Sequence, residues 1–173
     1  MKFSTHPKLL LFMPNPESVR THLDGCCFPE HIETMVQVYP GPGPVAAIEP
    51  VVEMAVERYK PEVVCWVNSA ADPPPTVEFW KSIRRKFRRL VHWVHDANCP
   101  ALHPMLQTYL DGDVFDMTIN SDGGSNWPRG PRDVVSLYPV NPERYSKPLV
   151  RDKAVSFSGS WSPHGPNGKP PSI

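Results

Sequence analysis

The chain has 173 residues, enough for one domain of ordinary size or for one domain and a fragment, and its 40% hydrophobic residues are sufficient for a core. Eighteen basic residues balance eighteen acidic ones, which argues against a protein that binds nucleic acid by neutralising phosphates. No segment reaches the roughly 18 apolar residues of a membrane span, and no signal peptide is evident. We therefore expect a cytoplasmic protein without a membrane span, whose four cysteines stay reduced.

The first half of the chain predicts strands separated by a helix. KLLLFMP at 8–14 is typical of a buried strand stopped by proline, and PEHIETMVQVYP at 29–40 fits a helix that runs into a short strand. The next helix tolerates Pro50 because we expect this proline in its first turn. The run VVCWV at 63–67 predicts a further buried strand. The apolar stripe of the helix before it is formed by Ile48, Val52, Ala55 and Tyr59.

The second half of the chain continues the alternation. We expect a helix over 76–87, a strand at RLVHWVHDA (89–97), a helix over 101–110, a strand over 114–120 and a short strand within DVVSLYPVNP (133–142). The apolar stripes of the two helices are Val77, Trp80, Ile83 and Phe87 in the first, and Leu102, Met105, Leu106 and Tyr109 in the second.

Strands that alternate with helices, and that are apolar without a two-residue period, indicate helices on both faces of a sheet. The sequence therefore predicts an α/β fold with a doubly wound, mostly parallel, Rossmann-like sheet. We expect this domain to cover residues 1–138 and a polar, proline-rich linker to cover 139–153. Residues 154–173 read as the start of a truncated second domain or as a disordered tail.

Polar residues follow the predicted strands at their carboxyl ends. In an open parallel sheet these ends share one edge, and ligands bind there where the strand order reverses. Small hydrogen-bonding residues at this edge suit a hydroxyl-rich ligand such as a sugar, although each could instead make a turn or a helix cap. The residues that we expect to bind the ligand are Asn15, Asn68, Ser69, Ser121, Asp122 and Gly123.

The segment RLVHWVHDANCPALH (89–103) concentrates three histidines, an aspartate and a cysteine. A metal site is one interpretation, but His92 and His95 are three residues apart on a strand and point to opposite faces, and the spacing matches no structural zinc pattern. We expect His92 to be a packed or partly exposed strand residue. His95 and Asp96 are the candidate catalytic residues, because an imidazole or a carboxylate can remove a proton from an attacking hydroxyl.

One strong basic cluster stands out in the predicted helix over 76–87 and just after it. Its favoured interpretation is a solvated helix face, and an anion-binding or partner-binding patch is the alternative. Its members are Lys81, Arg84, Arg85, Lys86, Arg88 and Arg89.

Three motifs in this order resemble the CgeB-type glycosyltransferases: VHWVHDA (91–97), YPVNPERY (138–145) and DKAVSFSGSW (152–161). These are GT-B enzymes related to the retaining, nucleotide-sugar-dependent transferases. The resemblance covers roughly residues 60 to 161 and departs from the family pattern at Asn141, usually acidic, and at Tyr145, usually Phe. It implies an acceptor-binding Rossmann-like domain, a second such domain for the nucleotide-sugar, and catalysis between them without an essential metal or any other cofactor.

Under this resemblance, Gly159 and Ser160 match the first glycine turn of the donor domain, most of which has no counterpart in the chain. The first hypothesis is the acceptor-binding half of a glycosyltransferase of the hexosyl-transferring kind, inactive alone, that binds a sugar or a glycosylated acceptor. The second is a non-catalytic ligand- or partner-binding module on the same sheet. An uncovered interdomain surface would also favour self-association.

Overall fold

The computed structural model describes residues 6–13, 34–38, 44–68, 74–95, 97, 99–121 and 128–135. This part of the chain forms strands, α-helices and short 3₁₀ helices in alternation. In chain order they are β1 (Lys8–Phe12), β2 (Thr34–Val38), α2 (Val45–Tyr59), β3 (Val63–Asn68), α3 (Val77–Ile83), η2 (Arg84–Lys86), β4 (Arg89–Val94), η3 (Pro100–Leu102), α4 (His103–Gly112), β5 (Met117–Asn120) and β6 (Asp133–Val135).

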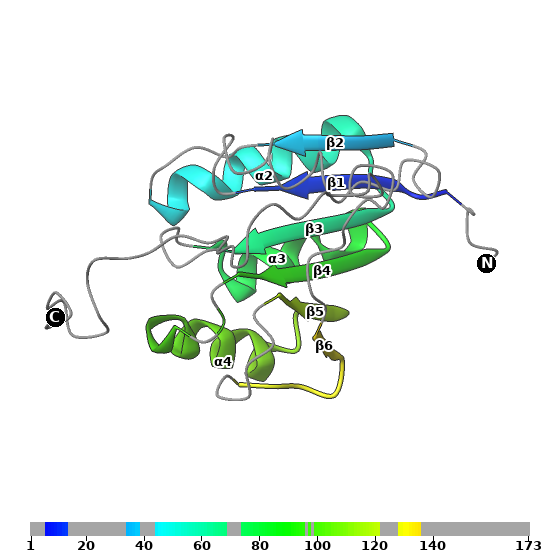
Figure 1. The fold of residues 1–173 in the computed structure, drawn as a ribbon. Helices are drawn as coiled ribbons and strands as arrows, with labels where there is room; N and C mark the ends of the chain where they lie inside the picture. The colour runs from blue at the N-terminus through cyan, green and yellow to red at the C-terminus, as the bar shows by residue number, and fades with distance from the viewer. Residues whose placement is uncertain are drawn as a thin grey trace, which may run out of the picture.

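The described strands form one parallel sheet in the order β2-β1-β3-β4-β5-β6 (Figure 1). The chain steps to one edge of the sheet from β1 to β2, then returns past β1 to β3 and continues toward the other edge. The strand order therefore reverses between β1 and β3, as it does in doubly wound sheets. The predicted fold class, an α/β fold with a parallel Rossmann-like sheet, is confirmed.

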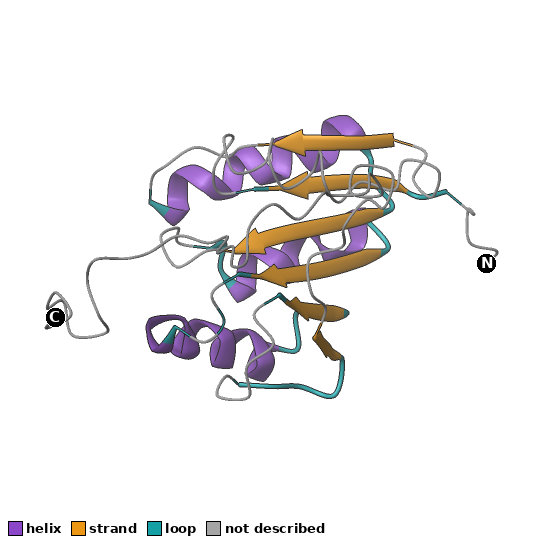
Figure 2. Ribbon diagram, viewed as in Figure 1, coloured by secondary structure: helices purple, strands orange, loops and turns teal. Residues whose placement is uncertain are grey.

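Both faces of the central strands are buried, which explains why their sequences are apolar without alternation. The helices α2, α3 and α4 all pack on one face, so within the described residues helices cover one face of the sheet and not the two that we expected. In Figure 2, α2 and α3 lie behind the strands. Side chains on this face and on the opposite face belong to separate clusters. The first cluster includes Leu10, Phe12, Val64, Trp66 and Leu90, and the second is formed by Leu11, Met13, Cys65 and Val67.

The helix α2 follows the predicted apolar stripe for most of its length. Ile48, Val52 and Ala55 are buried as expected, but Tyr59 is 38% exposed, because it is the last residue before the chain turns away at Lys60 in a left-handed conformation. The expectation that Pro50 lies in the first turn is wrong. It is the sixth residue of α2, where its ring is exposed to solvent and it cannot donate a backbone hydrogen bond.

The helix α3 begins at its N-cap Thr76, whose Oγ1 accepts a hydrogen bond from the backbone N of Phe79 at 3.1 Å. The helix predicted over 76–87 is too long, because α3 ends at Ile83 and the chain continues as the 3₁₀ turn η2. The guanidinium group of Arg84 stabilises this turn by donating to the carbonyl oxygens of Phe87 and Arg88. The predicted stripe is nevertheless confirmed, with Val77, Trp80, Ile83 and Phe87 all buried.

The helix predicted over 101–110 corresponds to η3 followed by α4, which ends at Gly112 and is capped by Asp113 in a left-handed conformation. Its predicted stripe lies against the sheet, with Leu102, Leu106 and Tyr109 buried and Met105 partly buried. The strand predicted over 114–120 is shorter, since β5 begins at Met117, opposite Val91 of β4. The predicted domain and linker boundaries lie outside the described residues.

Candidate functional site

The carboxyl ends of β3, β4 and β5 lie side by side at one edge of the sheet. Asn68 pairs with Val94, which pairs with Asn120 on the next strand. Just beyond the strands, the backbone N of His95 donates to the carbonyl oxygen of Asn68 at 2.9 Å, and the backbone N of Ser121 donates to that of Val94 at 3.3 Å. The predicted site residues Asn68, His95 and Ser121 are therefore neighbours.

The other predicted site residues lie outside the described part of the chain, so the structure does not locate them. They are Asn15, Ser69, Asp96, Asp122, Gly123, Gly159 and Ser160.

Asn68 is at the predicted edge, but its side chain points into the core on the helix-covered face. It is 1% exposed, and its Oδ1 accepts a hydrogen bond from Trp66 Nε1 at 2.8 Å. The Nε2 atom of His92 lies 3.4 Å from the same oxygen. Because Trp66 and Asn68 are two residues apart on β3, they share one face of the sheet. The side-chain oxygen of Asn68 thus hydrogen-bonds within the protein rather than at the surface.

His92 is a packed strand residue, as expected. Its ring stacks on Phe115 with centroids 4.5 Å apart and meets the edge of Tyr109 at 5.3 Å. Burial lowers the pKa of His92 to about 3, so the imidazole is neutral at physiological pH. His92 lies on β4 and His95 follows the end of that strand, three residues on, so the two side chains belong to opposite faces of the sheet. Among the described residues, no group of three His, Cys, Asp or Glu side chains could hold a metal ion.

The opposite face of the sheet edge carries a second group of side chains, Trp93, His95 and Ser121, which we call the Trp93 group. Trp93 Nε1 donates to Ser121 Oγ at 2.5 Å, and the rings of Trp93 and His95 are 5.5 Å apart between centroids. Trp93 and His95 are both half-buried. Trp93 was not among the predicted site residues, although its position two residues before His95 on a strand indicates the same face.

The Trp93 group has the functional groups to hydrogen-bond a polar ligand and to accept a proton from it. The imidazole of His95 can donate or accept a hydrogen bond and can act as a general base near neutral pH. The hydroxyl of Ser121, which already accepts from Trp93, has one further lone pair and its own donor. The indole of Trp93 supplies apolar ring surface beside these polar groups.

The topology of the sheet places the Trp93 group near the point where the strand order reverses. The reversal between β1 and β3 lies one strand away from β4, which carries Trp93 and His95. On the β1 side, the described chain extends to Met13, whose backbone N donates to the carbonyl oxygen of Val38 at 3.2 Å. The Trp93 group therefore borders the part of an open parallel sheet where ligands bind.

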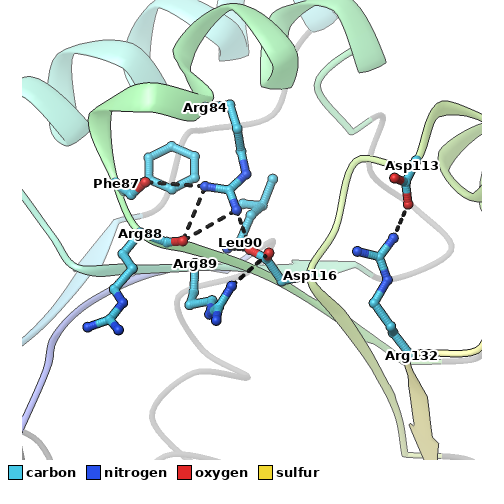
Figure 3. A network of polar contacts seen from close by, with 8 residues as sticks. All are labelled: Arg84, Phe87, Arg88, Arg89, Leu90, Asp113, Asp116 and Arg132. Atoms are coloured by element: carbon cyan, nitrogen blue, oxygen red, sulfur yellow. Dashed lines mark hydrogen bonds and ion pairs between the residues drawn. The ribbon is translucent and has the colours of Figure 1, made fainter. Parts of the chain in front are cut away.

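The basic cluster lies at the opposite, amino-terminal edge, and three of its six residues form ion pairs with other described residues; Figure 3 shows those of Arg84 and Arg89. Arg84 and Arg89 both reach Asp116, at 2.6 and 3.2 Å. Lys86 contacts Glu53 and Glu57 at 2.6 and 2.7 Å, and these contacts raise its pKa. The cluster is thus a partly neutralised surface rather than a uniform basic face.

No protein-family model, curated protein or solved structure matches this chain. Within the described ranges, none of the helices combines the length and the apolar character that crossing a lipid bilayer requires.

Proposed function

We propose that the chain binds a hydroxyl-rich ligand such as a sugar at the carboxyl edge of its sheet, as the acceptor-binding half of a nucleotide-sugar-dependent glycosyltransferase. One observation carries this proposal: the strand order reverses between β1 and β3, and the residues just after the nearby strands β4 and β5, His95 and Ser121, form the Trp93 group on one face of the sheet. The sugar class is supported by the functional groups of the Trp93 group and by the resemblance to CgeB-type glycosyltransferases.

In this proposal His95 contacts the acceptor hydroxyl and accepts its proton. Trp93 packs against the C–H surface of the sugar ring, and Ser121 hydrogen-bonds to a hydroxyl. Asp96 follows His95 directly in the sequence and remains the second predicted catalytic residue. The nucleotide-sugar would bind to a donor domain, of which Gly159 and Ser160 resemble the first turn, so we expect no hexosyl transfer without that domain.

A second candidate function is ligand binding without transfer, and the burial of the site favours it. Asn68 is 1% and Ser121 is 6% exposed, which leaves His95 as the more accessible of the three described residues that we predicted at this edge. A site with few accessible polar groups is sufficient for recognition, whereas transfer needs a reacting hydroxyl held beside a base.

Saturation-transfer NMR of the whole chain with a panel of monosaccharides and disaccharides tests the proposal. We expect binding of at least one sugar, and loss of that binding in His95→Ala and Trp93→Ala. The matched control is His6→Ala, which removes an exposed histidine from the opposite edge, just before β1. The absence of binding across the panel, or equal binding by wild type and His95→Ala, would contradict the sugar site. Transfer from a nucleotide-sugar by the chain alone would contradict the non-catalytic alternative.

We also infer that the chain self-associates and that it resides in the cytoplasm. Val134 and Val135 are 44% and 46% exposed on β6, the three-residue strand at one edge of the described sheet, and exposed apolar side chains favour association. Cys65 and Cys99 are free thiols, which suits a reducing compartment. Light scattering of wild type and of Val134→Lys tests the first point, because a strictly monomeric wild type at high concentration would refute it.

A further inference from the structure

A cavity of about 280 Å³ lies at the amino-terminal edge of the sheet, away from the Trp93 group. Residues 81–85 form the end of α3 and the start of the turn η2, which leads to β4. Residues 113–114 lead from α4 to β5, so both segments are at the end where these strands begin. The cavity is lined by Trp80, Lys81, Arg84, Arg85, Asp113 and Val114.

The ion pairs around this cavity leave it positively charged. Arg84 is paired with Asp116 at 2.6 Å, and Asp113 is paired with Arg132 (Figure 3). Lys81 and Arg85 are both exposed, and neither has an ion-pair partner among the described residues. The cavity is therefore lined by two positive side chains, Lys81 and Arg85, whose charges the ion pairs do not neutralise.

We propose that this cavity binds a phosphate-bearing small molecule, with Lys81 and Arg85 contacting the phosphate oxygens. A guanidinium group offers paired donors that match phosphate geometry, and an ammonium group adds a mobile point charge. The apolar part of the lining comes from Trp80 and Val114, which are 0% and 6% exposed, so the ligand would be held mainly through its phosphate. The volume is just below the roughly 300–1,000 Å³ of typical ligand pockets, which suits a small ligand.

A different explanation exists for the position of these two cations. Basic residues near the C-terminal end of a helix offset the negative end of its dipole, and Lys81 lies in the last turn of α3. That effect needs neither a cavity nor a convergence of both side chains on it. The two explanations differ in whether an added anion binds at a defined stoichiometry.

Calorimetric titration of the full chain with inorganic pyrophosphate, at low ionic strength in a phosphate-free buffer, tests this site. We expect saturable binding of one pyrophosphate per chain, and at least about tenfold weaker binding by the double variant Lys81→Ala/Arg85→Ala. The matched pair is Lys81→Ala against Lys86→Ala. Both remove one lysine from the same basic cluster, but Lys86 does not line the cavity, so Lys86→Ala should change the affinity by less than about twofold.

Two results would overturn the site: no saturable binding at millimolar pyrophosphate, or equal weakening by Lys86→Ala and Lys81→Ala, which indicates general attraction to a basic surface. Far-UV circular dichroism checks that each variant is folded, and Lys81→Gln/Arg85→Gln replaces the double alanine variant if that one is not. Backbone amide shifts of the wild type give an independent readout, since pyrophosphate should perturb residues 80–85 and 113–114.

Discussion

Asp116 connects the turn after α3 to the start of two neighbouring strands, and its replacement should be costly. Its carboxylate accepts hydrogen bonds from Arg84 Nη2 at 2.6 Å, from Arg89 Nη1 at 3.2 Å and from the backbone N of Leu90 at 2.7 Å (Figure 3). The side chain is only 20% exposed. The backbone N of Asp116 also donates to the carbonyl oxygen of Leu90 at 2.9 Å, which fixes the start of β5 against β4.

The expected loss of stability follows from these contacts. A hydrogen bond to a charged group contributes about 1.5–3 kcal/mol, and the contact with Leu90 is of this kind. The pair with Arg89, which is half exposed, adds at most about 1 kcal/mol. Arg84 retains two backbone carbonyl acceptors after the change, which limits the cost of its lost partner. We expect Asp116→Ala to lower the free energy of unfolding by about 3 kcal/mol, and Asp116→Asn, which keeps an acceptor, by about half as much.

Urea denaturation of the wild type and the variants measures this effect. Asp111→Ala is the control, because Asp111 is exposed on α4 and its side chain accepts one hydrogen bond, from Gln107 at 2.8 Å. That variant should cost less than about 0.5 kcal/mol. A double-mutant cycle with Arg84→Met isolates the contact between the two side chains. A stability of Asp116→Ala equal to that of the control, or no coupling in the cycle, would refute the reasoning.

Three further predictions concern buried groups. Tyr109→Phe should lower the free energy of unfolding by about 1–2 kcal/mol, because the buried phenol donates to the carbonyl oxygen of Pro75 at 2.6 Å; urea denaturation indistinguishable from wild type would refute this. Burial lowers the pKa of His92 to about 3, so the unfolded chain binds a proton first. The contribution of His92 to the free energy of unfolding is therefore fully present above about pH 6.5. It falls by about 1.4 kcal/mol per pH unit between about pH 6.5 and pH 3, and His92→Gln should flatten this slope in denaturation curves measured across pH. Burial raises the pKa of Cys65 to about 12, so iodoacetamide should modify it only after unfolding, as peptide mass spectrometry would show; rapid native labelling would count against this.

The fold was predictable because the strands and helices have distinct apolar patterns. The unalternating runs of β1 and β3 predict strands covered on both faces, and both faces are buried. The spacing of Val77, Trp80 and Ile83 predicts the buried stripe of α3. The end of α3 was not predictable, since it depends on bonds from Arg84 to carbonyl groups that its own turn brings close.

The sequence predicted that Asn68, His95 and Ser121 lie at one edge of the sheet, but not which side chains they contact. The carboxyl edge follows from parallel strands alone, and the neighbouring positions of Asn68 and His95 agree with it. Sequence could not indicate that the oxygen of Asn68 accepts from Trp66, because this depends on which face of β3 the helices cover. The bond between Trp93 and Ser121 joins residues 28 positions apart, one on β4 and one just after β5, and no local pattern specifies the pairing of these strands.

The central claim is that a sugar binds at the carboxyl edge of the sheet beside β4. Amide chemical-shift mapping of the full chain during titration with the best sugar of the panel tests it most directly. We expect the shifts to concentrate at the strand ends, at residues 68, 93–95 and 120–121, and to disappear in His95→Ala. Shifts confined to the amino-terminal edge, around Asp113 and Asp116, or shifts that persist in His95→Ala, would contradict the claim.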